Sequence, residues 1–139
     1  MVKNAPITQE DPFGCGVACV AFALGFSYQK TLKLFKKGKQ KAKTKGFYCK
    51  DLVRTLNNQG RNFKYRYIKD MIRNKIYQNN TIVFIKRSRK YPWGHYLCRY
   101  ENSWMDPWIN FPENKNIRKA RPGLRKRLPG YPIYAIIPQ

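Results

Sequence analysis

The stretch that decides the fold is QEDPFGCGVAC, residues 9–19, near the start of a chain of 139 residues. It runs into an apolar segment, so Cys15–Leu24 is predicted to form a buried helix that ends at Gly25. Small residues along this segment indicate that other elements pack closely around it. Cys15 is the first residue of the helix, where the positive end of the helix dipole favours a thiolate over a thiol. The sequence therefore predicts a reactive cysteine at a helix start.

Two later motifs supply the groups that a thiolate nucleophile needs. The chain has a single histidine, His95, in a Gly-His-Tyr motif, and Asp106 follows eleven residues later in an Asp-Pro motif. An imidazolium stabilises a thiolate, and a carboxylate on the other ring nitrogen fixes the orientation of the ring. His95–Tyr100 and Ser103–Met105 are predicted to form a hairpin, which brings Asp106 back toward His95.

Gln9 lies six residues before Cys15 and completes the candidate site. Its side-chain amide and the Cys15 backbone N–H are predicted to stabilise a developing oxyanion. Each residue type alone has an ordinary structural explanation, since a cysteine at a helix start is most often a core residue and Asp-Pro commonly opens a turn. The order Gln, Cys, His, Asp, with each residue in a fitting element, favours a thiol hydrolase site.

The pattern resembles the papain-like cysteine peptidases that process bacteriocin leaders at double-glycine sites, and their stand-alone peptidase-like relatives. The resemblance extends over residues 7–138. It implies an α+β, papain-like fold with N-terminal helices packed on a C-terminal antiparallel sheet. It also implies that Cys15 is the nucleophile, His95 the general acid and base, Asp106 the residue that orients the histidine, and Gln9 the oxyanion donor.

The remaining sequence indicates helices first and strands later, within a single domain of residues 1–139. Two strongly basic segments, Lys36–Lys45 and Lys115–Arg127, have no apolar period and are predicted to be solvated, largely as loops. Further helices are predicted at Tyr28–Lys37, Tyr48–Gln59 and Ile68–Asn79, and further strands at Phe63–Tyr67, Thr81–Ile85 and Tyr134–Ile137.

The charge balance is extreme, with 29 Lys and Arg against 7 Asp and Glu, a net charge of +22. Because 42% of the residues are hydrophobic and 15% aromatic, the chain is not a disordered basic protein. The two basic segments hold 13 of the 29 cationic residues and lie outside the catalytic motifs. They predict a docking surface for an acidic protein substrate or partner, with nucleic acid as the alternative.

The four cysteines, Cys15, Cys19, Cys49 and Cys98, are predicted to be free thiols. A zinc site built from these residues and His95 is the alternative, although the sequence has no Cys-x-x-Cys pair. We therefore expect neither a metal nor a cofactor. The N-terminus lacks a signal-peptide pattern, and the longest apolar stretch is too short to span a membrane. We expect synthesis in the cytoplasm, with delivery out of the cell by a dedicated system left open.

The sequence thus predicts an enzyme, a cysteine peptidase or related thiol hydrolase that cleaves a peptide or a related acyl bond. A small, basic catalytic domain also suggests a delivered effector or toxin module with an acidic partner. One alternative is a cell-wall amidase on the same fold. The other is an inactive papain-like module that binds nucleic acid through interleaved aromatic and basic residues such as Phe63–Tyr67. The complete Gln, Cys, His, Asp set argues against the inactive module.

Overall fold

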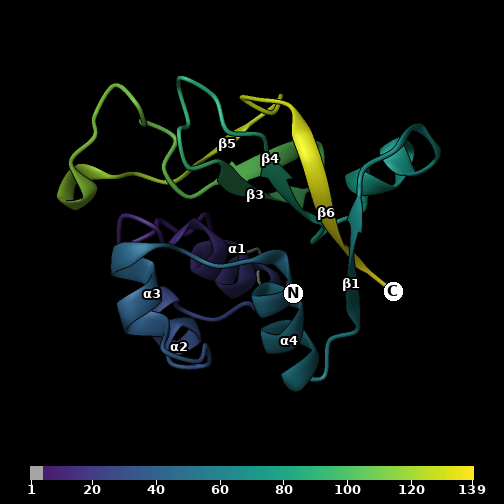
Figure 1. Cartoon of the computed structure of the whole chain (residues 1–139), viewed down its shortest axis with the longest axis horizontal. Helices are drawn as coiled ribbons and strands as arrows, with labels where there is room; N and C mark the ends of the chain where they lie inside the picture. Colours follow the sequence, from purple (N-terminus) through teal and green to yellow (C-terminus); the bar gives the residue numbers. More distant parts are fainter. Residues whose placement is uncertain (1–4) are drawn as a thin grey trace.

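The computed structural model describes residues 5–139, apart from the side chains of residues 70 and 71. Over these residues four α-helices come first and cover one face of a six-stranded antiparallel sheet (Figure 1). The helices are α1 (Cys15–Leu24), α2 (Tyr28–Leu32), α3 (Gly38–Thr44) and α4 (Cys49–Asn58). The sheet has the order β1-β6-β2-β3-β4-β5, from β1 (Phe63–Tyr67), β2 (Ile82–Ile85), β3 (His95–Tyr100), β4 (Ser103–Asp106), β5 (Gly123–Arg125) and β6 (Pro132–Pro138). The predicted α+β class is confirmed.

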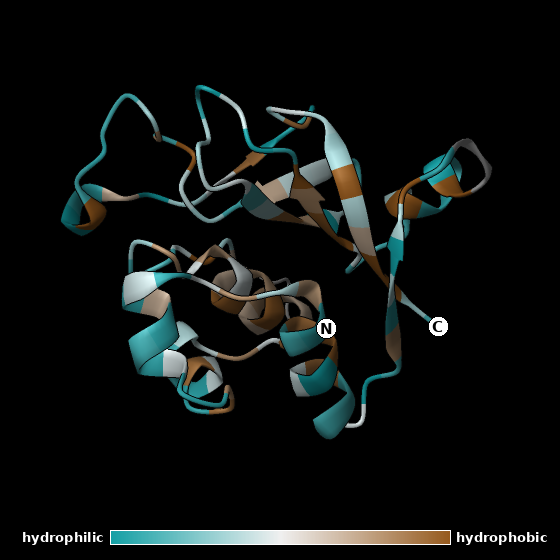
Figure 2. Cartoon of the chain, in the orientation of Figure 1, coloured by the Kyte–Doolittle hydropathy of each residue, from teal (hydrophilic) through white to brown (hydrophobic). Residues whose placement is uncertain are grey.

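Helix α1 packs against β3 of the sheet and against α2 and α4, and it is buried from Gly16 to Leu24. A helix that is apolar on all sides is stable only where other elements surround it. It ends as predicted at Gly25, whose left-handed φ of 75° lets its N–H reach the carbonyls of Ala21 and Phe22. The brown interior in Figure 2 follows this layer of contact between helix and sheet. The segment that begins with Cys15 is therefore the centre of the main core.

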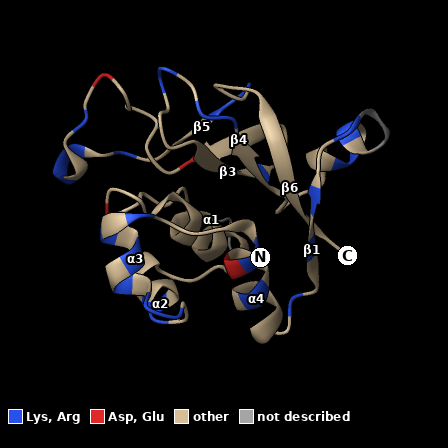
Figure 3. Cartoon of the chain, in the orientation of Figure 1, with Lys and Arg blue, Asp and Glu red and all other residues tan. Residues whose placement is uncertain are grey.

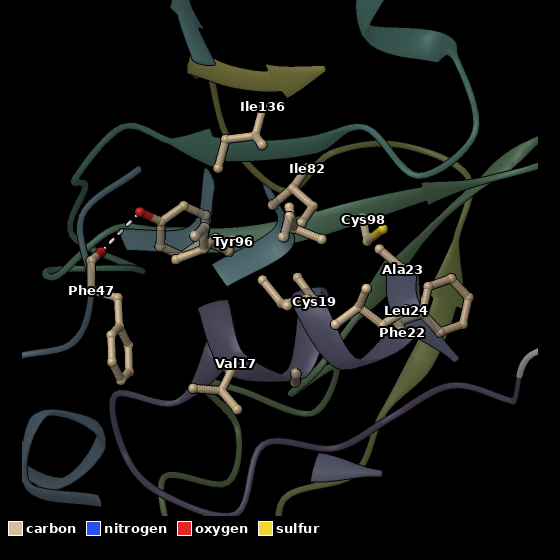
Figure 4. Packing of buried hydrophobic residues seen from close by; sticks show 14 of the residues in the cluster. Val17, Cys19, Phe22, Ala23, Leu24, Phe47, Ile82, Tyr96, Cys98 and Ile136 are labelled. Atoms are coloured by element: carbon tan, nitrogen blue, oxygen red, sulfur yellow. Dashed lines mark hydrogen bonds between the residues drawn. The ribbon is translucent and has the colours of Figure 1, made fainter. Parts of the chain in front are cut away.

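Tyr96 fastens strand β3 to the helical layer. Its ring is buried beside α1, and its hydroxyl donates a hydrogen bond of 2.9 Å to the Phe47 carbonyl (Figure 4). Gly16 permits this approach, because a Cβ there would lie 3.3 Å from the Tyr96 ring and 3.1 Å from Leu52. The tyrosine of the Gly-His-Tyr motif thus fixes the strand that carries His95.

A second buried cluster covers the opposite face of the sheet. Trp104 and Leu97 project from the central strands into it, and Ile76 covers them from the 3-10 helix η1 (Asp70–Tyr77). The α-helix predicted at Ile68–Asn79 is therefore wrong, since this segment forms the shorter 3-10 helix η1 instead. No helix among residues 5–139 is long and apolar enough to cross a membrane.

The prediction for Tyr28–Lys37 and the following basic segment is partly wrong. Ser27 caps α2, since its side chain accepts the Lys30 N–H, but the helix ends at Leu32. Gly38 does not stop a helix; it begins α3, and a Cβ at this position would overlap the Leu32 carbonyl. The Lys36–Lys45 segment is therefore mainly helical rather than a loop. Lys, Gln and Ala are good helix formers, and a buried face of only Gly38 and Ala42 gives no apolar period in the sequence.

The Lys115–Arg127 segment is largely irregular, as predicted, but it also forms the short 3-10 helix η2 (Ile117–Lys119) and strand β5. Strand β5 pairs with β4, placing Gly123 opposite Asp106 and Arg125 opposite Trp104. A strand of three residues carries too few side chains for an alternating pattern to be recognised. This missed strand matters because it lies beside the candidate site.

We predict that Leu52→Ala lowers the free energy of unfolding by about 2–5 kcal/mol, because it leaves a cavity between α4 and α1. Leu52 is fully buried, whereas Leu124 is 44% exposed and provides the same truncation at the surface. Chemical denaturation of both variants should show a large loss for Leu52→Ala and a change within about 0.5 kcal/mol for Leu124→Ala. Equal losses would contradict the packing described for α1 and α4.

Candidate active site

Cys15 opens α1 after a tight turn that is held from two sides. The Gly14 N–H donates to the Asp11 carbonyl at 3.0 Å, and the Phe13 N–H donates to the Ala42 carbonyl of α3 at 2.8 Å. Gly14 is required by packing, because a Cβ there would overlap the Tyr28 hydroxyl. Cys15 itself is half-buried, so its thiol is both ordered and reachable.

His95 begins β3 and is almost completely buried. The chain enters the strand through Gly94, which has a left-handed φ of 75° and lies against the Phe84 ring, where a Cβ would overlap. Nε2 of His95 lies 2.7 Å from Oδ1 of Asp106. The Tyr91 ring is stacked on the imidazole, with ring centroids 5.2 Å apart and an angle of 20° between the planes. The predicted hairpin therefore brings His95 and Asp106 together.

Asp106 is 0% exposed and is surrounded by groups that stabilise an anion. Its Oδ1 accepts the Trp108 N–H at 2.9 Å in addition to His95. Its Oδ2 lies 3.2 Å from Nε of Arg125 on β5. Although this distance is short, the orientation is not that of a hydrogen bond, so the contact is an ion pair.

The electrostatics favour an ion pair at the centre of the site. Burial lowers the pKa of His95, but the Asp106 carboxylate and the nearby Cys15 raise it, and the net pKa is about 10. Burial raises the pKa of Asp106, but the imidazolium, the Trp108 N–H and Arg125 bring it below its usual range. Since Nε2 faces Asp106, Nδ1 is the ring nitrogen left to meet Cys15. The three side chains can therefore carry a thiolate, an imidazolium and a carboxylate in series.

Gln9 is 2% exposed and lies in the segment that leads to Cys15. Its backbone N–H donates to the Pro107 carbonyl at 3.1 Å, which ties this segment to the residue after Asp106. Its side-chain Nε2 donates to the carbonyls of Asp11 at 3.0 Å and Pro12 at 3.1 Å. The amide protons are thus engaged in bracing the turn before Cys15, and its role as oxyanion donor stays a prediction.

The four cysteines are free thiols. Burial raises the pKa of Cys19, Cys98 and the half-buried Cys49. Within residues 5–139, no three His, Cys, Asp or Glu side chains lie together in a way that could hold a metal ion. Cys15 differs from the other three because it lies at a helix start beside an imidazole.

A cleft of about 490 Å³ lies between the loops that carry the site residues. Its walls come from the residues just before Cys15, just before His95 and just after Asp106. Trp93 is 64% exposed at this cleft and packs edge-on against Phe13, with ring centroids 5.8 Å apart. Trp108 also lines the cleft, whereas Trp104 is buried on the far face of the sheet. The remaining lining residues are Pro12, Arg89, Lys90, Pro92, Phe111, Pro112 and Lys115.

Three contributors to the site were missed by the sequence analysis. Arg125 comes from the segment Lys115–Arg127, which was predicted to be largely loop. No motif marked Tyr91 either. The Trp108 N–H had a signal, because an aspartate followed by proline often accepts the N–H two residues on. Asp106 accordingly has both roles that its motif suggested, since it opens a turn and contacts His95.

We predict that Gly14→Ala displaces Cys15 and slows its alkylation by about tenfold, because the new methyl group collides with the Tyr28 hydroxyl. Tyr28→Phe removes that hydroxyl, so the double variant Gly14→Ala/Tyr28→Phe should regain much of the rate lost in Gly14→Ala. Iodoacetamide kinetics followed by mass spectrometry measure the effect. A double variant as slow as Gly14→Ala, with Tyr28→Phe itself near the wild type, would contradict this geometry.

Comparison with known proteins supports the architecture. Neither a scan against protein families nor a search of curated proteins finds a match. Among solved structures, the chain is similar to the peptidase domain of Streptococcus ComA, a bifunctional ABC transporter involved in a quorum-sensing pathway. The identity is 21% and the TM-score 0.54, over 99% of this chain and 100% of the ComA domain. With helices at the N-terminus packed on a C-terminal antiparallel sheet, the chain has the papain-like fold of that peptidase domain.

Proposed function

We propose that this protein is a cysteine peptidase in which Cys15 attacks a peptide or related acyl bond. The observation that carries the proposal is the buried His95–Asp106 pair, 2.7 Å apart, with Cys15 at the start of α1 close enough to raise the pKa of His95. A buried carboxylate fixed on Nε2 directs Nδ1 toward the thiol and stabilises the imidazolium. An imidazolium held beside a cysteine favours the nucleophilic thiolate form.

The reaction follows from the two protonation states of His95. The Cys15 thiolate adds to the carbonyl carbon, and His95 gives its proton to the leaving amine as the C–N bond breaks. Water then attacks the thioester while His95 takes a proton from it, and the thiolate leaves as the acid product forms. Asp106 keeps the ring oriented through both steps. Backbone N–H groups at the start of α1, with Gln9 if its amide is released, stabilise the oxyanion.

We predict that iodoacetamide alkylates Cys15 near pH 7 and that His95→Ala slows this alkylation by about tenfold or more. Without the imidazolium, the site loses the cation that favours the reactive thiolate form of a cysteine. Since the pKa of His95 is about 10, the imidazolium is present throughout the range from about pH 6 to 8. The wild type should therefore react faster than His95→Ala over this whole range.

The control is Cys49→Ser, which removes a half-buried thiol outside the series and should leave the rate at Cys15 unchanged. The modified residue is identified by mass spectrometry of the intact and digested protein. Equal alkylation of the wild type and His95→Ala across this pH range would contradict the peptidase proposal.

The proposed substrate is an acidic peptide or protein. The cleft beside the site combines aromatic walls with Arg89, Lys90 and Lys115, and its lining includes no acidic residue. Elsewhere Lys and Arg are spread over the helices, the loops above the sheet and the β1–η1 end, whereas Asp and Glu are rare (Figure 3). A cationic cleft on a molecule of charge +22 attracts anionic segments and raises their rate of encounter. The proposed role as a delivered effector or toxin with an acidic partner rests on the same charge.

We predict that Cys15→Ala, used as a trap, enriches acidic peptides from a random peptide library. Replacing Arg89, Lys90 and Lys115 by Gln should abolish this preference, because the charge facing the bound peptide is lost. A matched variant with Lys39, Lys43 and Lys45 on and after α3 replaced by Gln removes the same charge from positions that do not line the cleft and should keep the preference. An equal loss in both variants would show that net charge alone, and not the cleft, selects the peptides.

The cell-wall amidase alternative would use the same thiol, and no feature of the site favours it over a peptidase. The nucleic-acid alternative has one supporting observation, since β1 is an edge strand whose residues Lys64 to Tyr67 are exposed. Binding of nucleic acid does not require a buried imidazole and carboxylate next to a thiol at a helix start. The peptidase is therefore the function that the site supports best.

A further inference from the structure

Arg125 is a charged residue beside the site that the proposed chemistry does not use. In the β4–β5 pairing Gly123 lies opposite Asp106, so Arg125 is the diagonal neighbour of Asp106 on the same face of the sheet. That separation is within reach of a long side chain. Strand β5 thus delivers a guanidinium to the carboxylate that orients His95.

The guanidinium acts on two groups at once. Its Nε lies 3.2 Å from Oδ2 of Asp106, and its positive charge counteracts the rise that burial causes in the pKa of Tyr91. The Arg125 side chain is 26% exposed, whereas the Asp106 side chain has no exposure at all. Oδ1 of Asp106 is already bonded to His95 and Trp108, and Oδ2 accepts no hydrogen bond among the described residues. Arg125 is therefore the cation that compensates the second carboxylate oxygen.

Both partners of Arg125 touch the imidazole. Asp106 holds Nε2 at the edge of the ring, and Tyr91 lies on its face. A cation that acts on both the Asp106 carboxylate and Tyr91 therefore restricts both the rotation and the tilt of the His95 ring. We infer that Arg125 is a positioning residue for His95, acting through Asp106 and Tyr91. This inference rests on the proposed peptidase function, since it assigns a further residue to the same site.

The charge of Arg125 has a second effect on His95. An uncompensated buried carboxylate would hold the imidazolium proton more tightly, while a general acid has to release that proton to the leaving group. Arg125 partly neutralises Asp106 and so keeps His95 a better acid. The other titratable groups around this pair are Cys15 and Cys19 from α1 and Tyr91 from the loop before β3. Glu113 acts on Tyr91 from the loop after β4.

The single histidine of the chain makes a direct test possible, because its imidazole signals in an NMR titration have one source. We predict that Arg125→Gln raises the pKa of His95 by on the order of one pH unit and slows alkylation of Cys15 near pH 7 by about threefold to tenfold. Lys126→Gln removes a charge from the adjacent exposed position and should change neither quantity. In an Asp106→Asn background, Arg125→Gln should no longer move the pKa of His95.

Arg125→Lys keeps the charge but loses the planar guanidinium whose Nε lies against Asp106. Its His95 pKa should therefore equal that of the wild type while alkylation slows by about threefold. This variant also tests the inference if Arg125→Gln does not fold. An alkylation rate in Arg125→Lys equal to that of the wild type would overturn the positioning role of Arg125. An unchanged His95 pKa in a folded Arg125→Gln would overturn the inference whatever happens to stability.

The two proposals fail in different ways. If the wild type does not alkylate faster than His95→Ala, the peptidase proposal fails, although the NMR titration still reports whether Arg125 acts on His95. If the wild type alkylates as predicted but Arg125→Gln leaves both the His95 pKa and the rate unchanged, only the role of Arg125 is overturned.

Discussion

A carboxylate that has lost all contact with water is stable as an anion only if neighbouring donors and cations replace its hydration. Asp106 is in this position, and its two oxygens meet His95, the Trp108 N–H and Arg125. Each of these groups comes from a different part of the chain. Because removing any one of them would leave a buried charge undercompensated, the ends of β3, β4 and β5 are held in one arrangement.

The N-terminal segment is then attached to this point by ordinary backbone contacts. Gln9 bonds to the Pro107 carbonyl, and Thr8 donates its hydroxyl to the same carbonyl at 3.1 Å, across almost a hundred residues of sequence. On the other side, Phe13 bonds to Ala42 of α3. The turn that presents Cys15 is thus fixed both to the sheet and to the helical layer. Catalytic geometry in this fold depends as much on these main-chain ties as on the reacting side chains.

The sequence predicted those parts of the site that carry strong local signals. The Cys15 helix is a long apolar run ending at glycine, and the hairpin joining His95 to Asp106 has two clear strands around one turn. These signals are local, so they can be recognised in the sequence without knowledge of the fold. Helix α3 was missed because its buried face is made of Gly38 and Ala42, whose small side chains leave no apolar period. Arg125 was missed because its importance arises only from its register opposite β4.

The same distinction applies to the excess positive charge. In the sequence, the two basic segments lie outside the catalytic motifs, and both were predicted to belong to one docking surface. In the fold they separate into three groups. The lysines of α3 lie on a helix whose inner face supports the turn before Cys15, Lys115 lines the cleft, and Arg125 touches the buried carboxylate. In salt solution the effect of an exposed charge is screened over about 10 Å. The role of each Lys or Arg therefore depends on its position in the fold and not on the basic segment to which it belongs. Arg125 lies six residues after Lys119 of η2 and next to Lys126. It differs in function from these basic neighbours because its side chain, on the short strand β5, points toward Asp106.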